Sequence, residues 1–99
     1  MIDLKSDYLS VIQDILSKRL QGERIYVFGS RVNGTAKPHS DIDLMIESTE
    51  PLDENLILTL KNDFEDSDLP IRVDILDGSQ LSASFRAIVD AKKVELLLH

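Results

Sequence analysis

The sequence contains no cysteine, and it carries only 11 lysines and arginines against 18 acidic residues. The absence of cysteine excludes a disulfide-stabilised scaffold and a thiolate zinc site. The net charge of -7 argues against a protein that coats DNA or RNA through its own surface field, so we expect no direct nucleic-acid binding. A phosphate-bearing small substrate stays compatible, because a bound cation can reverse the local sign of the charge.

Long apolar runs are also missing. No stretch approaches the roughly 20 residues that a membrane-spanning helix needs, and the N-terminus is acidic and amphipathic, unlike a signal peptide. We therefore expect no membrane partner and a cytoplasmic location. The 99 residues, 42% of them apolar, fit a single small domain over 1–99 with one core. Any site on so small a domain is expected to be a shallow cleft.

The periodicity of apolar residues predicts alternating helices and strands. Helical spacing predicts helices over residues 3–20, 53–66 and 79–91. β-branched and aromatic runs predict strands over residues 25–28, 41–47 and 71–76. Residues 94–98 fit either a short edge strand or a docking tail. In the last helix the pattern predicts that Leu81, Phe85, Ile88 and Val89 face inward.

Residues 29–40 separate the first two strands and are rich in Gly, Ser, Asn, Thr and Pro, which is typical of a loop with at most one helical turn. This connection is short for a parallel crossover, so we expect the first two strands to be antiparallel. The expected fold is α/β (α+β), a small mixed β-sheet with helices packed on it.

Two acidic residues open the second predicted strand. Asp41 and Asp43 are two positions apart, so in a strand they share one face while Ile42, Leu44 and Ile46 share the other. Carboxylates held side by side repel unless a cation lies between them, and hard oxygen ligands suit Mg²⁺. The alternative is that both are solvated turn residues, although Asp is disfavoured at a strand position such as 43.

Asp74 lies inside the otherwise apolar strand 71–76. One interpretation is a surface carboxylate paired with Arg72, which shares its face. The other places Asp74 on a strand beside Asp41 and Asp43, where three carboxylates would hold up to two metal ions for phosphoryl or nucleotidyl transfer. Asp74 would then also be a candidate general base for an attacking hydroxyl.

Gly29 and Ser30 end the first predicted strand. A glycine here permits close approach of the backbone to phosphate, and Ser30 supplies a hydroxyl and an N–H; an ordinary turn is the alternative. The stretch lacks the Gly-Lys-Ser/Thr ending of a Walker A loop and the glycine spacing of a Rossmann fingerprint. Arg31 is a further candidate for nucleotide contact, or a loop cation without a role.

Taken together, these pieces form a joint motif: Phe28-Gly29-Ser30-Arg31, Gly34-Thr35-Ala36 and Ser40-Asp41-Ile42-Asp43-Leu44, followed by the strand-borne Asp74. The combination resembles the minimal nucleotidyltransferase (MNT) domain of the DNA polymerase beta-like nucleotidyltransferase superfamily, and the resemblance covers nearly the whole chain. It implies Mg²⁺-dependent transfer of a nucleoside monophosphate, AMP from ATP, to a hydroxyl. It also implies that Gly29 and Ser30 hold the triphosphate, that Asp41 and Asp43 ligate metal, and that Asp74 is the third carboxylate and the base.

Small stand-alone members of that superfamily resemble the antitoxin half of HEPN–MNT toxin–antitoxin pairs. There the MNT protein binds a helical HEPN partner and in some systems adenylylates a tyrosine on it. The resemblance therefore implies a HEPN-type protein partner for this chain. The alternative is a binding module, an antitoxin or regulatory subunit that neutralises its partner by contact without catalysis.

Overall fold

Helices and strands alternate along the chain in the predicted order. The computed structural model describes residues 1–98, and His99 lies outside them. The elements are α1 (Ser6–Arg19), β1 (Arg24–Phe28), α2 (Ser30–Asn33), β2 (Ile42–Glu47), α3 (Glu54–Glu65), β3 (Val73–Asp77), the 3-10 turn η1 (Gly78–Gln80), α4 (Ala83–Lys92) and β4 (Val94–Leu96). Of the two options for residues 94–98, the structure shows the edge strand.

The four strands form one mixed sheet in the order β3-β2-β1-β4. β1 is antiparallel to both β2 and β4, while β2 and β3 run parallel. The expected antiparallel pairing of the first two strands is thus confirmed. The parallel pair is joined through α3, which gives the chain the length that a parallel crossover requires.

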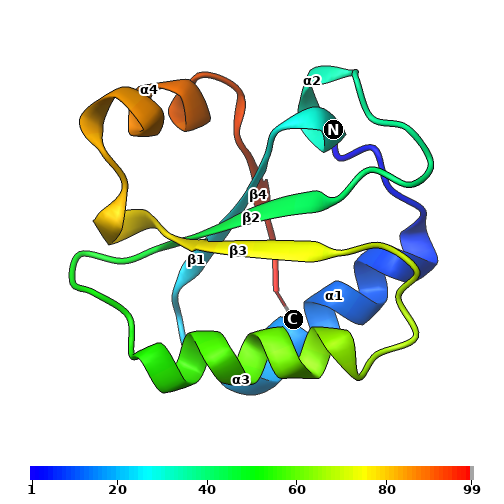
Figure 1. Cartoon of the computed structure of the whole chain (residues 1–99), viewed down its shortest axis with the longest axis horizontal. Helices are drawn as coiled ribbons and strands as arrows, with labels where there is room; N and C mark the ends of the chain where they lie inside the picture. Colours follow the sequence, from blue (N-terminus) through cyan, green and yellow to red (C-terminus); the bar gives the residue numbers. More distant parts are fainter. Residues whose placement is uncertain (99) are drawn as a thin grey trace.

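The main core lies between the sheet and the helices α1 and α3, which Figure 1 shows below the strands. Ile12 and Leu16 of α1 and Leu60 of α3 are fully buried there. They pack against side chains from alternate positions of the strands: Ile25, Val27, Ile42, Leu44, Ile46, Val73, Ile75 and Leu96. Asp53 begins α3 by accepting the Asn55 N–H, as an N-cap residue does.

Within residues 1–98, η1 and α4 lie on the opposite face of the sheet, and Figure 1 shows α4 above the strands. Met45 and Val89 are buried there. The prediction that Ile88 faces inward is wrong, because Ile88 is 70% exposed. Adjacent helical residues point about 100° apart, so a helix that seats Val89 on the sheet turns Ile88 to solvent. Phe85 is also expected to face inward, but it is 38% exposed, with its ring edge-on to Phe28. Ser82 caps α4 by accepting the Phe85 N–H and separates the helix from η1.

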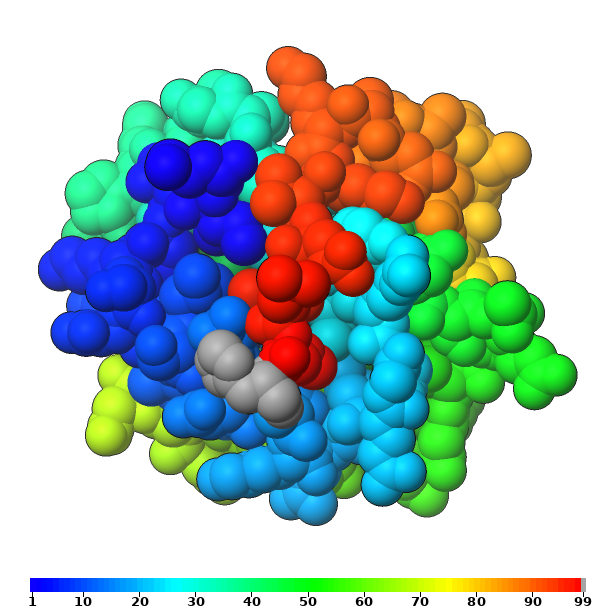
Figure 2. Space-filling model, turned by 180° about the vertical axis from the view of Figure 1, so that it is seen from behind, coloured from blue at the N-terminus to red at the C-terminus, as the bar shows by residue number. Residues whose placement is uncertain are grey.

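The C-terminal segment closes the back of the molecule. Figure 2 shows it beside the N-terminal helix and β1. Gln13 of α1 donates a hydrogen bond to the Leu97 carbonyl at 2.9 Å, and β4 pairs with β1. Within residues 1–98, no helix is long and apolar enough to cross a membrane.

Leu44→Ala tests the central position of β2 in the core. Leu44 is fully buried, so truncation should lower the free energy of unfolding by about 3 kcal/mol through lost burial and a residual cavity. Leu58→Ala is the matched control, because Leu58 is 57% exposed and should change stability by no more than about 0.5 kcal/mol. Urea denaturation followed by circular dichroism measures both. Equal losses would contradict the proposed core.

Candidate active site

Asp43 and Asp74 lie side by side on neighbouring strands. In the register of the sheet Phe28 pairs with Asp43 and Asp43 pairs with Asp74. Ile42 and Leu44, which flank Asp43, point into the core, so alternation sends the Asp43 carboxylate to the face that α4 covers. Asp74 reaches that same face. The structure therefore brings together two of the three predicted acids.

The surroundings of Asp43 disfavour its charged form. Burial raises the pKa of this half-buried carboxyl, and the neighbouring carboxylates of Asp74 and Asp41 raise it further. Arg72 opposes the shift. Burial and the two neighbouring carboxylates thus outweigh the opposing effect of Arg72 on the pKa of Asp43.

Asp41 lies just before β2 and is exposed. The Arg72 guanidinium links it loosely to Asp74: its Nε lies 4.0 Å from Asp41 Oδ2 and its Nη2 lies 2.9 Å from Asp74 Oδ1. Both interpretations of Asp74 drawn from the sequence therefore describe part of the structure, since this residue lies beside Asp43 and also pairs with Arg72.

The acids offer the hard oxygen donors that Mg²⁺ prefers, and a dication would relieve the repulsion at Asp43. Their side chains are not gathered around one point, however. Among residues 1–98 no group of three or more His, Cys, Asp or Glu side chains is placed to hold a metal ion. The donor chemistry fits a divalent cation, but the carboxylates must converge to bind one.

Gly29 allows the turn after β1 to approach Asp43. Its φ is 78°, a conformation that favours glycine. A Cβ on Gly29 would lie 2.5 Å from Asp43 Oδ2, closer than van der Waals contact allows. The Gly29 carbonyl also accepts the N–H groups of Val32 and Asn33, both at 3.1 Å, which starts the short helix α2 at Ser30. The Gly-Ser bend thus lies against the acids.

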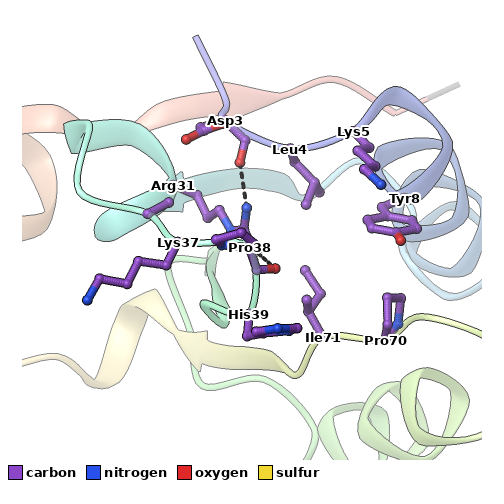
Figure 3. Close-up of a pocket in the computed structure, with 11 residues that line it drawn as sticks. Asp3, Leu4, Lys5, Tyr8, Arg31, Lys37, Pro38, His39, Pro70 and Ile71 are labelled. Atoms are coloured by element: carbon purple, nitrogen blue, oxygen red, sulfur yellow. Dashed lines mark hydrogen bonds between the residues drawn. The ribbon is translucent and has the colours of Figure 1, made fainter.

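Arg31 is the site residue whose surroundings differ most from expectation. It is not an exposed loop cation, because only 6% of its surface is exposed. Its Nη1 donates to the Asp3 carbonyl at 3.0 Å, and its Nη2 donates to the Ser40 carbonyl at 2.7 Å and the Pro38 carbonyl at 3.4 Å. Figure 3 shows the guanidinium between these segments. Arg31 therefore fixes the loop that leads into Asp41; its contact with nucleotide stays a prediction.

Three hollows lie near these residues, and one of them, lined by Lys61, Arg72 and Asp74, does not reach Asp43. The one in Figure 3, of about 500 Å³, is bounded by the N-terminal segment, the 36–39 loop and residues 70–71, and contains none of the three acids. The third, of about 470 Å³, contains Asp43 and Asp74 with Phe28, Lys61 and Phe85. This third hollow, the acid cleft, holds the two paired carboxylates of Asp43 and Asp74. Sequence reasoning did not assign Lys61 or Phe85 to the site, and no local pattern distinguishes them, since they come from α3 and α4.

The arrangement of strands and helices is the nucleotidyltransferase fold. A chain in the crystal structure of a toxin–antitoxin with AMP-PNP superposes with a TM-score of 0.74 at 26% identity, covering 92% of this chain and 73% of that chain. A chain of the toxin–antitoxin MntA-HpeT superposes with a TM-score of 0.70 at 26% identity, covering 97% of this chain and 74% of that one.

Sequence comparison gives the family. Residues 10–98 match the model of the family "Polymerase beta, Nucleotidyltransferase". "Probable protein adenylyltransferase MntA" of Haemophilus influenzae is 46% identical over 88 residues, which cover 89% of this chain and 77% of the relative. An aminoglycoside (3'') (9) adenylyltransferase of Klebsiella pneumoniae is 38% identical over 78% of this chain but only 30% of its own length. The chain belongs to the polymerase beta nucleotidyltransferase family.

Gly29→Ala tests the approach of the bend to Asp43. A methyl group there meets the Asp43 carboxylate and also a strained φ, whereas Gly34→Ala carries the same type of strain, at a φ of 84°, with nothing within 4 Å. Strain should cost each variant about 1 kcal/mol of stability. Gly29→Ala should lose more than this, because of the clash with Asp43, and only this variant should bind nucleotide more weakly. Thermal unfolding and calorimetry with an ATP analogue measure this. Equal behaviour of the two variants would contradict the close approach.

Asp43→Asn tests the electrostatics in metal-free buffer. The folded-state pKa of Asp43 is raised above its ordinary 3.8, so its contribution to stability is full below that value and is lost as pH rises through the folded pKa. The variant should therefore be more stable than wild type at pH 7, with the difference vanishing in acid, as measured by urea unfolding across pH.

Asp77→Asn is the control of opposite sign. Burial tends to raise the pKa of Asp77, but N–H groups of Leu52 and Ser79 and the Ser79 hydroxyl donate to its carboxylate and lower it overall. This variant should lose stability at pH 7 and approach wild type as pH falls through the lowered pKa. Asp43→Asn losing stability at neutral pH would contradict the account.

Proposed function

We propose that this protein transfers AMP from ATP to a hydroxyl on a HEPN-type helical toxin partner and thereby acts as its antitoxin. The observation that carries the proposal is the pairing of Asp43 with Asp74 on one face of the sheet, beside the Gly29–Ser30 bend. Support comes from the Haemophilus influenzae relative, named as a protein adenylyltransferase, and from similar chains in toxin–antitoxin complexes, one of them with AMP-PNP.

Asp41, Asp43 and Asp74 are proposed to hold divalent metal, and Mg²⁺ is the ion we assign. Bound there, the metal would neutralise charge on the triphosphate and stabilise the leaving oxygen. Asp43 is suited to this role because burial and two neighbouring carboxylates destabilise its bare charge. Gly29 and Ser30 would hold the triphosphate with backbone N–H groups and the Ser30 hydroxyl. Arg31, on this proposal, keeps the loop before Asp41 in place.

The proposed reaction is a single in-line displacement. The acceptor hydroxyl oxygen forms a bond to the α-phosphorus of ATP while the bond from that phosphorus to the α–β bridging oxygen breaks. Pyrophosphate leaves with the bonding electron pair. The Asp74 carboxylate accepts the hydroxyl proton. For this role the acceptor hydroxyl must bind within hydrogen-bonding reach of Asp74. The acid cleft has about 470 Å³ for the reacting groups.

The partner and the compartment belong to the same proposal. The protein's surface is acidic overall, and α4 presents Ile88 and part of Phe85 to solvent next to the acid cleft. Exposed apolar groups of this kind are available for contact with another protein. We propose a cytoplasmic location, where ATP is available for the reaction.

A non-catalytic antitoxin is the second candidate. It is favoured by one observation, that the three carboxylates are not gathered into a metal site among residues 1–98. Such a protein would neutralise its partner by contact alone and would not need the acids.

Label transfer from [α-³²P]ATP to the partner distinguishes the two candidates. The protein, the partner and Mg²⁺ are incubated together, and the partner is then separated by denaturing electrophoresis. Wild type should label the partner, whereas Asp41→Ala, Asp43→Ala and Asp74→Ala should each lose at least about 100-fold in rate, since each removes a group that stabilises the transition state. Asp68→Ala, an exposed acid elsewhere, should retain full activity. If wild type and all three alanine variants inhibit the partner and none of them transfers label to it, the non-catalytic alternative is established.

Ser30→Ala tests the triphosphate contact. Loss of one hydroxyl contact to a charged phosphate should weaken ATP binding roughly tenfold, as measured by calorimetry. The thermal unfolding midpoint should stay within a few degrees of wild type, because Ser30 makes no side-chain hydrogen bond within residues 1–98. Unchanged affinity would remove Ser30 from the site.

A further inference from the structure

Arg72 occupies the space between the carboxylates that the proposed function assigns to metal. It lies one residue before β3, and both its Nε and its Nη2 lie 2.9 Å from Asp74 Oδ1. Its Nε also lies 4.0 Å from Asp41 Oδ2. One guanidinium therefore faces acids that come from two different segments of the chain.

We propose that Arg72 is an internal counter-cation that competes with divalent metal for Asp74 and Asp41, and this inference rests on the proposed function. Positive charges close together repel, so a guanidinium held 2.9 Å from Asp74 Oδ1 opposes metal binding at the same carboxylate. Bound metal in turn weakens this ion pair and favours displacement of the guanidinium. Displacement is feasible because 74% of the Arg72 side chain is exposed, and exposed ion pairs are weak. Arg72 thereby supplies positive charge to these carboxylates until metal replaces it.

Two further observations support this role. Hydrogen bonding to Asp74 and the charges of Asp74, Asp41 and Asp43 raise the pKa of Arg72, so the residue keeps its charge at all relevant pH values. Within residues 1–98 the three acids also do not converge on one point, and Arg72 contacts two of them. Lys61 also lies close by, in the acid cleft with Asp43 and Asp74, but within residues 1–98 it forms no ion pair.

Mn²⁺ binding to the nucleotide-free protein tests the inference, with free Mn²⁺ followed by electron paramagnetic resonance. Arg72→Ala should bind Mn²⁺ at least about threefold more tightly than wild type, in line with the modest strength of an exposed pair. Lys61→Ala removes an equal charge nearby without breaking an ion pair, so it should change the affinity less. In an Asp74→Asn background, removal of Arg72 should have a smaller effect than in wild type, because the shared partner is gone.

Thermal unfolding gives a readout that does not depend on activity. Mn²⁺ should raise the unfolding midpoint more in Arg72→Ala than in wild type, because a ligand that binds the folded state more tightly stabilises it more. Arg72→Gln, which keeps more of the side chain, replaces the alanine variant should the latter fail to fold. Equal or weaker Mn²⁺ binding by both Arg72 variants would overturn the inference.

The outcomes separate this inference from the proposed function. Equal Mn²⁺ affinity in wild type and Arg72→Ala, with label transfer intact, refutes only the counter-cation role. Absence of Mn²⁺ binding in all variants, even with an ATP analogue present, refutes the proposed metal-dependent function itself.

Discussion

Repulsion between two carboxylates on adjacent strands is the interaction on which the rest of this site depends. Asp43 and Asp74 pair in the register of β2 and β3, and burial adds to the cost of the charge on Asp43. They are held there by their neighbours in sequence: Ile42, Leu44, Val73 and Ile75 all point into the core between the sheet and α1 and α3. Hydrophobic burial on one face thus fixes an unfavourable charge pair on the other.

The surrounding segments adapt to this charge in different ways. The bend at Gly29 approaches Asp43 so closely that no Cβ fits. The Nη groups of Arg31 donate hydrogen bonds to backbone carbonyls of the N-terminal segment and of the loop before β2. Arg31 therefore holds the loop in place and does not pair with the acids. Arg72, one residue before the edge strand β3, supplies the compensating charge. The buried Arg31 therefore positions the loop, and the exposed Arg72 contacts the acids.

Much of this arrangement is predictable from the sequence, because it depends on local alternation. The period of two along residues 41–47 and 71–76 predicts both strands and the common face of Asp43 and Asp74, and the short loop predicts the antiparallel turn from β1 to β2. The surroundings of Arg31 are not predictable, since its partners lie up to 28 positions away. The exposure of Ile88 and the presence of Phe85 and Lys61 in the acid cleft likewise depend on how α4 and α3 seat on the sheet, which local pattern does not determine.

The central claim is that these acids, with the bend at Gly29 and Ser30, form one site for a metal–nucleotide complex. A crystal structure with Mn²⁺ and a non-hydrolysable ATP analogue tests it most directly, because anomalous scattering locates the ion. The account predicts an ion about 2.1 Å from carboxylate oxygens of Asp43 and at least one other of the three acids, with the triphosphate against the backbone of Gly29 and Ser30. An ion or triphosphate bound elsewhere, with Asp43 and Asp74 free of both, would contradict it.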